Sequence, residues 1–318
     1  MHTDDAMRPQ TLVSVVTPCF NEVANVEEVC SRVAGELGAL NCDFEHIVID
    51  NASTDGTVEL LRRLAAKWPH LRVILNRRNF GHLRSPYHAV LQAKGDAVII
   101  LAADLQDPPE LIPELLKRWR AGAEVVLLVK TGADESRWRQ ALRRLFYRVL
   151  SLASPVGIVR GAHGSGLYSR ATIEYLRTLP EPYPFLRGLV LEGGFSLDTI
   201  GFHQPMRKAG KSSNGIRNLY DTAMLGLITH SRVLLRMTMS AAILLGVVSA
   251  LLALFYFVRK LLDWDNFTLG LAPLVIGVFT VASVQLFFLA VMAEYLGDIH
   301  SRLRNQPHVV ERERLNFD

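Results

Sequence analysis

Residues 99–110, Ile-Ile-Leu-Ala-Ala-Asp-Leu-Gln-Asp-Pro-Pro-Glu, join an apolar run to two carboxylates and a Pro-Pro break. This order is typical of a buried strand that ends at a cleft and places acidic side chains there. Mg²⁺ prefers carboxylate oxygens and is usually held by one or two of them together with water and substrate phosphates. Asp104 and Asp107 are therefore candidates for a metal and phosphate site, although solvated acids at a strand end explain this segment alone equally well.

The first 130 residues alternate apolar runs with amphipathic segments, which predicts an α/β domain with a mainly parallel, Rossmann-like sheet. The runs are almost wholly apolar, as in a sheet that helices cover on both faces. The expected strands are 12–18, 46–50, 72–75, 97–101 and 125–129, and the expected helices are 21–40, 58–68, 85–93 and 110–121.

Polar residues follow four of these strands, at the edge where ligands bind in such sheets. They are Pro18–Glu22, Asp50–Asp55, Asn76–Gly81 and Asp104–Asp107. Asp50 is suited to hydrogen-bond the base or ribose of a nucleotide; its alternative role is the N-cap of the next helix, which Ser53 or Asp55 would fill better. Gly81 permits close approach of the backbone to a ligand.

Two long uncharged runs in the last third of the chain predict a pair of membrane helices. Residues 237–258 and 267–293 are each long enough, as helices, to cross a bilayer core of roughly 30 Å. Residues 259–266 are expected to form a short non-cytoplasmic turn between them, and 216–236 an amphipathic juxtamembrane helix before them. The alternative is a buried helical pair in a soluble domain, and two runs of this length argue against it.

Lys and Arg are concentrated before the first run and after the second, which predicts that both flanks are cytoplasmic. Residues 1–10 are expected to be disordered, because they are polar and lack the apolar core of a signal peptide. The protein is thus expected to be a multi-pass protein of the cell membrane. Its α/β domain, 11–215, and its tail, 294–318, would both be cytoplasmic.

The chain has 318 residues, of which 49% are hydrophobic and 21% charged, so it is too apolar for a disordered protein. Its net charge of +4 suits anionic partners such as lipid headgroups or nucleotide phosphates. The sequence has no basic stripe interleaved with aromatic residues, so a nucleic-acid partner is not expected. Cys19, Cys30 and Cys42 lack the paired spacing of a zinc site and are expected to be small core residues.

The segment 204–214, Gln-Pro-Met-Arg-Lys-Ala-Gly-Lys-Ser-Ser-Asn, is a further candidate for phosphate binding. It is cationic and carries hydroxyl groups. Arg207 can pair two phosphate oxygens, and Lys211 adds a point charge. A juxtamembrane basic loop held by anionic lipid is the alternative.

Four motifs occur in the order found in family-two glycosyltransferases: Pro18–Glu22, Asp50–Thr57, Arg78–Gly81 and Asp104–Glu110. With two apolar runs behind them, the chain resembles the polyprenyl-phosphate (dolichol-phosphate-mannose-synthase-like) branch, which carries two C-terminal transmembrane helices. The resemblance implies a GT-A-type domain that uses Mg²⁺ or Mn²⁺. It also implies transfer of a sugar from a nucleotide-sugar donor to a polyprenyl (undecaprenyl or dolichyl) phosphate, and a homo-oligomer is expected.

Carried over by position, the resemblance implies that Asp104 contacts the metal and that Arg207 closes over the donor diphosphate, both as catalytic residues. The donor-binding residues are then expected to be Pro18, Asn21, Glu22, Asp50, Asn79, Gly81, Asp107, Gly210, Lys211 and Ser212. Ala102 departs from the pattern, because the branch usually reads Asp-Ala-Asp where this chain has Ala102-Ala103-Asp104. Loss of that carboxylate is expected to weaken cation binding more in the empty enzyme than in the donor complex, since the diphosphate supplies oxygens.

A second departure lies at Gly161–Arg170, where many relatives carry an aspartate proposed as a base and this chain, with Gly164, has no acid. A phosphate monoester is already largely ionised near neutral pH, so we expect no base. His163 and Glu192 are the alternatives, with a loop histidine and a packed helix as their simpler interpretations. The expected chemistry is one displacement with inversion; a catalytically silent relative that binds donor or lipid without turnover is the alternative function.

Overall fold

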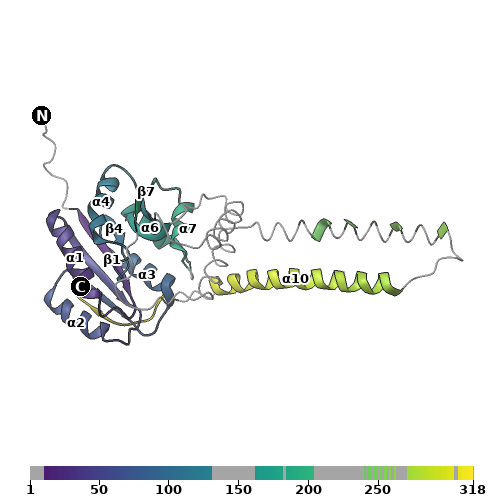
Figure 1. Ribbon diagram of the computed structural model, residues 1–318, viewed down its shortest axis with the longest axis horizontal. Coiled ribbons are helices and arrows are strands. Elements are labelled where there is room, and N and C mark those ends of the chain that lie inside the picture. The colour runs from purple at the N-terminus through teal and green to yellow at the C-terminus, as the bar shows by residue number, and fades with distance from the viewer. Residues whose placement is uncertain are drawn as a thin grey trace. The chain divides into compact units, whose positions relative to one another are not determined.

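The computed structural model describes residues 11–130, 162–181, 184–203, 271–303 and 307–317, together with scattered positions between 240 and 262 (Figure 1). The chain divides into two compact units. One is an α/β domain that carries the four motifs and also takes in the C-terminal residues 307–317. The other contains the long helix α10 (Leu271–Leu303).

A mixed sheet of eight strands forms the centre of the α/β domain. The strand order is β7-β5-β6-β4-β1-β2-β3-β8, in which β6 and β8 run antiparallel to the other six. The mainly parallel sheet expected from the sequence is therefore confirmed. The strands are β1 (Leu12–Cys19), β2 (Asp43–Asp50), β3 (Leu71–Asn76), β4 (Ala97–Ile100), β5 (Val125–Lys130), β6 (Ala162–Ser169), β7 (Leu197–Phe202) and β8 (Glu311–Leu315).

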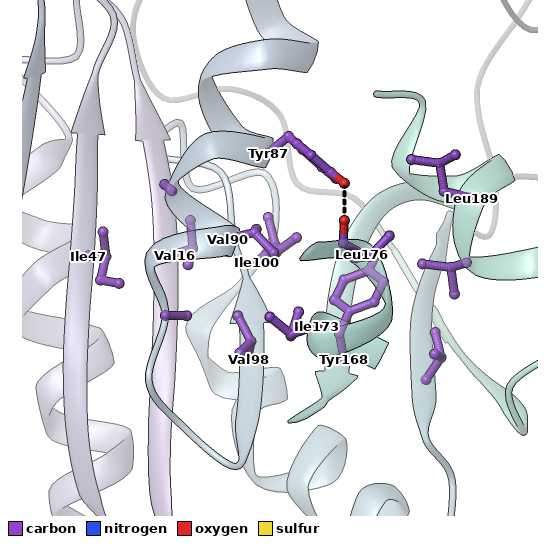
Figure 2. Close-up of a cluster of buried hydrophobic side chains, with 14 of the residues drawn as sticks. Val16, Ile47, Tyr87, Val90, Val98, Ile100, Tyr168, Ile173, Leu176 and Leu189 are labelled. Atoms are coloured by element: carbon purple, nitrogen blue, oxygen red, sulfur yellow. Dashed lines mark hydrogen bonds between the residues drawn. The ribbon is translucent and has the colours of Figure 1, made fainter. Parts of the chain in front are cut away.

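Helices cover both faces of the sheet, which is why its central strands are apolar on both sides. Helices α1, α2 and α4 pack on one face, and α3, α6 and α7 on the other. Figure 2 shows the second face, where the Tyr87 hydroxyl of α3 donates a hydrogen bond to the Leu176 carbonyl oxygen of α6 at 2.8 Å. The helices are α1 (Val26–Ala39), α2 (Thr57–Lys67), α3 (Gly81–Gln92), α4 (Ile112–Arg120), α6 (Arg170–Thr178) and α7 (Leu186–Glu192), with the 3-10 turn η1 (Pro109–Leu111) before α4.

Two helices begin four or five residues away from the positions that the pattern predicts, whereas α2 and α4 begin within two residues of them. Helix α1 starts at Val26 and not at Asn21, because Asn21 has a left-handed φ of +57° and a turn follows it. The Glu22 carbonyl oxygen accepts the N–H groups of Asn25 and Val26, so this turn leads directly into the helix. Helix α3 starts at Gly81 and not at Ser85, which puts the end of the Arg78–Gly81 motif in its first turn.

Three strands, β6, β7 and β8, were not predicted. The interpretation of His163 as a loop histidine is wrong, because residues 162–169 form β6 between β4 and β5. Gly166 permits this close pairing, since a Cβ there would collide with the Val126 carbonyl oxygen. Strand β8 comes from the expected tail and joins the edge of the sheet beside β3; it is the yellow strand in Figure 1.

Among the described residues, one helix is long and apolar enough to cross a membrane. This is α10, whose most apolar window is Thr280–Gly297. Its described side chains are exposed or half-buried, including large apolar ones such as Leu286, Phe287 and Leu289. The described positions between 240 and 262, within and just beyond the first expected span, are helical and exposed.

Candidate active site

The motif residues gather at one edge of the sheet because their strands are parallel. Strands β1, β2, β3, β4 and β5 all end at this edge, and in the ladder Cys19 pairs with Asp50 and Asp50 with Leu75. Strand β6 runs the other way, so it begins at this edge, with Ala162 paired to Val129 and Gly166 to Ile100. The convergence expected from the sequence is therefore observed for the described motifs.

Asp50 closes β2 with a fully buried carboxylate. Its Oδ2 accepts the Ser53 backbone N–H at 2.9 Å, and its Oδ1 accepts the Cys19 thiol at 3.7 Å. Burial raises the pKa of the Asp50 carboxyl, and the hydrogen bonds from Ser53 act against that rise. Asp55 instead accepts the Thr57 N–H at the start of α2, at 3.1 Å. The N-cap of α2 is Gly56, which has no side-chain capping hydrogen bond, so neither Ser53 nor Asp55 fills that position. Asp50 lies further upstream, at the end of β2.

Asn21 and Glu22 form the turn that follows β1, after Pro18 in the strand. The exposed Asn21 side chain accepts the Thr54 N–H through Oδ1 at 2.8 Å, and the Asn21 N–H donates to Ser53 Oγ at 2.8 Å. Glu22 is buried, and its Oε2 accepts the Asn25 amide at 2.6 Å. The turns after β1 and β2 are therefore one hydrogen-bonded unit.

Asn51 organises the loop between β3 and α3. Its Nδ2 donates to Asn79 Oδ1 at 2.9 Å and to the Gly81 carbonyl oxygen at 3.2 Å, while its Oδ1 accepts the Phe80 N–H at 2.9 Å. Asn76 Nδ2 donates to the same Oδ1 at 3.2 Å. Gly81 has φ of +85° with no atom near the place of a Cβ, so its left-handed backbone is what requires glycine here. Asn79 and Gly81 are thus brought together by a buried residue to which sequence reasoning gave no role.

Asp104 and Asp107 lie on a tight turn after β4, in which Leu105 has φ of +59°. Asp104 is half-buried, and its Oδ1 accepts the Gln106 N–H at 3.1 Å. Asp107 is buried, and its Oδ2 accepts the Ser165 hydroxyl of β6 at 2.5 Å. The antiparallel strand β6 therefore holds the Asp107 carboxylate in place. This contact joins two residues that are 58 positions apart in the sequence.

The sequence analysis missed Lys130, a half-buried residue at the end of β5. Burial lowers the pKa of the Lys130 ammonium, the carboxylates of Asp107 and Asp104 raise it, and the Arg187 guanidinium lowers it further. All three groups are therefore within electrostatic range of Lys130. Lys130 could have been found from the sequence, because it directly follows the fifth apolar run. Asp50 was identified in the same way, as a polar residue at the carboxyl end of a parallel strand.

No group of three or more His, Cys, Asp or Glu side chains that could hold a metal occurs in the described part of the chain. The acids present still fit a Mg²⁺ or Mn²⁺ ion that takes one or two carboxylates and completes its shell with substrate phosphates. Asp104 would be the protein ligand, with Asp107 close by in sequence and on the same turn. Ala102 lies in this turn and contributes only its N–H, 3.5 Å from Asp107 Oδ2.

Some expected site residues lie outside the described residues: Arg207, Gly210, Lys211 and Ser212. Glu192 is the last residue of α7 and is exposed, so the expected helix is confirmed for this segment. His163 lies on β6, one residue before Gly164.

Residues 14–177, just over half of the chain, match the family described as glycosyl transferase family 2, and the chain belongs to this family. The protein is therefore a glycosyltransferase with an α/β, GT-A-like fold around a mixed sheet.

Relatives match over almost the whole chain. An uncharacterized glycosyltransferase of Bacillus subtilis (strain 168) is 29% identical over 301 residues, covering 94% of this chain and 93% of the relative. The bactoprenol glucosyl transferase of Shigella phage SfII is 27% identical over 299 residues, covering 94% and 96%. Among solved structures, glucosyl-3-phosphoglycerate synthase from Mycobacterium tuberculosis in complex with Mn²⁺, UDP and phosphoglyceric acid is similar with a TM-score of 0.49 and 20% identity, covering 69% of this chain and 77% of that one.

Proposed function

We propose that the protein transfers a sugar from a nucleotide-sugar donor to a polyprenyl phosphate. The observation that carries this proposal is one edge of the sheet, where Asp104 and Asp107 follow β4, Lys130 ends β5 and the Asn51-ordered loop follows β3. Asp104 and Asp107 could hold a divalent cation, and Lys130 could bind a phosphate group. Such a site suits two substrates that both carry phosphate. The acceptor class is supported by relatives named bactoprenol glucosyl transferase, which match this chain well beyond the family domain.

The chemistry we propose is a single displacement with inversion. An oxygen of the lipid phosphate attacks the anomeric carbon, and the nucleotide diphosphate leaves from the opposite side. Since the phosphate is already largely ionised near neutral pH, no general base is needed, in agreement with the lack of an acid at Gly164. Asp104 would hold a divalent ion at this edge of the sheet, and Arg207 would bind the donor diphosphate directly. A bound Mg²⁺ or Mn²⁺ would supply charge neutralisation of the leaving group.

In this proposal Lys130 binds a phosphate group, because it is a half-buried cation within electrostatic range of both acids. Its lowered pKa reflects burial, and a phosphate dianion beside it would raise that pKa again. Asp50, Asn79 and Gly81 hold the nucleoside part of the donor. The enzyme's contribution is thus positioning together with neutralisation of phosphate charge.

The chain order supports two membrane crossings. Strand β8 pairs with β3 in the sheet that also contains β1, so the chain enters and leaves the stretch between 203 and 307 on one side of any membrane. This pairing supports an even number of crossings in that stretch. Helix α10 supplies one candidate, and the uncharged run 237–258 is the natural second one.

The remaining parts of the proposal concern location and assembly. The Lys and Arg bias at the helix flanks supports a cytoplasmic catalytic domain on the cell membrane. Residues 1–10 would be a disordered N-terminus, and 216–236 an amphipathic helix on the membrane surface. Assembly as a homo-oligomer is part of the same proposal.

A catalytically silent relative is the second candidate, and Ala102 is the observation that favours it. The two functions differ in turnover. Purified full-length protein would be incubated with polyprenyl phosphate, Mg²⁺ or Mn²⁺ and a panel of radiolabelled nucleotide sugars. A labelled lipid product with one donor supports the transferase; donor binding without any lipid product across the panel supports the silent protein.

A further inference from the structure

We propose that the C-terminal residues 307–317, here called the C-terminal strap, position the loop Arg77–Gly81 for donor binding. The inference rests on the proposed function, in which Asn79 and Gly81 contact the nucleotide sugar. It assigns a role in the site to a segment that lies more than 200 residues away in the sequence and contains none of the four motifs.

The strap holds both ends of the loop. At the first residue of the loop, the Arg77 N–H donates to the Val310 carbonyl oxygen at 3.0 Å, and Arg77 Nε donates to the Glu311 carbonyl oxygen at 3.2 Å. After the loop, Arg84 Nη2 donates to the Pro307 carbonyl oxygen at 2.6 Å. A loop held on both sides by one segment of chain has less conformational freedom to lose when a ligand binds.

The strap is also fastened to α3, the helix that begins at Gly81. His88 Nε2 lies 2.5 Å from Glu311 Oε1, and the His308 ring packs edge-on against Tyr87 with ring centroids 5.0 Å apart. Burial alone would raise the pKa of the Glu311 carboxyl, but the hydrogen bonds from Arg314 and His88 lower it. Glu311 is therefore an ionised anchor at neutral pH, and Tyr87 carries the connection into the core shown in Figure 2.

A β-bulge marks the point where the strap meets the loop. Leu75 pairs with Glu313 and the next residue, Asn76, pairs with Glu311, so the register shifts between them. Bulges bend a strand and are frequent beside active sites. Asn76 is also the residue that donates to Asn51 Oδ1, so the strap acts on the same network that orders Asn79 and Gly81.

The strap could instead stabilise the domain without any effect on the site, and β8 offers a matched pair that distinguishes the two roles. Glu311 and Glu313 are two residues apart on the same strand, and each forms an ion pair. Glu311 pairs with His88 of α3, whereas Glu313 pairs with Arg62 of α2 at 2.7 Å. Partly exposed ion pairs contribute little to stability, so both alanine variants are expected to fold.

The experiment compares full-length wild type, Glu311→Ala and Glu313→Ala. Binding of UDP, GDP, CDP and ADP is measured by calorimetry with Mg²⁺, and amide hydrogen exchange is followed at Phe80 and Gly81. For the nucleotide that wild type binds, Glu311→Ala should bind about fivefold to tenfold more weakly and exchange faster at both amides. Glu313→Ala should match wild type in both measurements.

Equal nucleotide affinity in wild type and Glu311→Ala would overturn the inference, and so would an equal loss in both variants. A wild-type protein that binds none of the four nucleotides would refute the proposed function itself, and the inference with it. The wild-type measurement therefore separates the two failures.

Discussion

Replacing Asn51 with alanine should both destabilise the domain and weaken donor binding. The Asn51 side chain is 7% exposed and takes part in four hydrogen bonds, to Asn79, Gly81, Phe80 and Asn76. A net contribution of about 1 kcal/mol for each, with buried partners left unpaired, gives a loss of roughly 2–4 kcal/mol. For a domain of this size that loss lowers Tm by roughly 5–15 °C.

The assay combines thermal unfolding of the detergent-solubilised full-length protein with calorimetry of the bound nucleotide. Asn316→Ala is the matched control. Asn316 lies in the strap, but its Nδ2 donates to the carbonyl oxygens of Ala65 and Leu71 at 2.8 Å, at the end of β3 opposite to the loop Arg77–Gly81. Asn316 has φ of +59°, so its alanine variant carries additional backbone strain and should lose at least comparable stability. Only Asn51→Ala should weaken nucleotide binding, by about tenfold or more. An Asn51→Ala protein with wild-type Tm and wild-type nucleotide affinity would refute the role of this network.

Three further predictions concern the acids, the missed lysine and a buried histidine. Asp104→Ala should reduce transfer by at least about a hundredfold in a radiolabelled assay, because the diphosphate loses its protein-held cation. Ala102→Asp should stay active and should bind Mn²⁺ more tightly in the absence of donor. An inactive Ala102→Asp would contradict the assignment of Asp104 as the metal ligand. Lys130→Met should lower kcat/KM by about tenfold to a hundredfold through the loss of a charged hydrogen bond to phosphate, while Lys117→Met, at an exposed position on α4, serves as the control that should remain at the wild-type value. Burial lowers the pKa of His46 to about 3 in the folded protein, whereas the unfolded chain binds that proton near pH 6.5. The free energy of unfolding therefore falls as the pH drops below about 6.5. Between pH 7 and pH 5 His46 should account for about 2 kcal/mol of that fall, measured as the difference between wild type and His46→Gln in urea unfolding; identical pH profiles would argue against a buried neutral His46.

Five of the six parallel strands, β1 to β5, could be predicted because they are largely buried. The sixth, β7, is mostly exposed and was missed. Runs such as 97–101 and 125–129 are continuous and apolar, and their order with intervening helices specifies neighbouring parallel strands. Asp50 and Asp104 followed from the same rule, since strand ends collect polar side chains at one edge. Lys130 was missed although it obeys this rule.

The antiparallel strands could not be predicted from local pattern. Strand β6 reads Ala-His-Gly-Ser-Gly-Leu-Tyr-Ser, and its pairing with β4 and β5 depends on close backbone contact at Gly166. Strand β8 reads Glu-Arg-Glu-Arg-Leu, a charged run that is typical of a solvated tail. It becomes an edge strand because its charged side chains form ion pairs with two helices. Glu313 pairs with Arg62 of α2, and Glu311 pairs with His88 of α3. The hydrogen bond from Ser165 to Asp107 and the contacts of the strap therefore depend on pairing between distant parts of the sequence, which a local pattern does not reveal.

The most direct test is the structure of the lipid product formed by the wild-type enzyme from a nucleotide sugar and polyprenyl phosphate. The linkage and the anomeric configuration can be read from one NMR spectrum of the purified product. We predict a sugar joined through its anomeric carbon to the lipid phosphate, with the configuration inverted relative to the donor. Retained configuration, or release of free sugar without a lipid-linked product, would contradict transfer by a single displacement onto a polyprenyl phosphate.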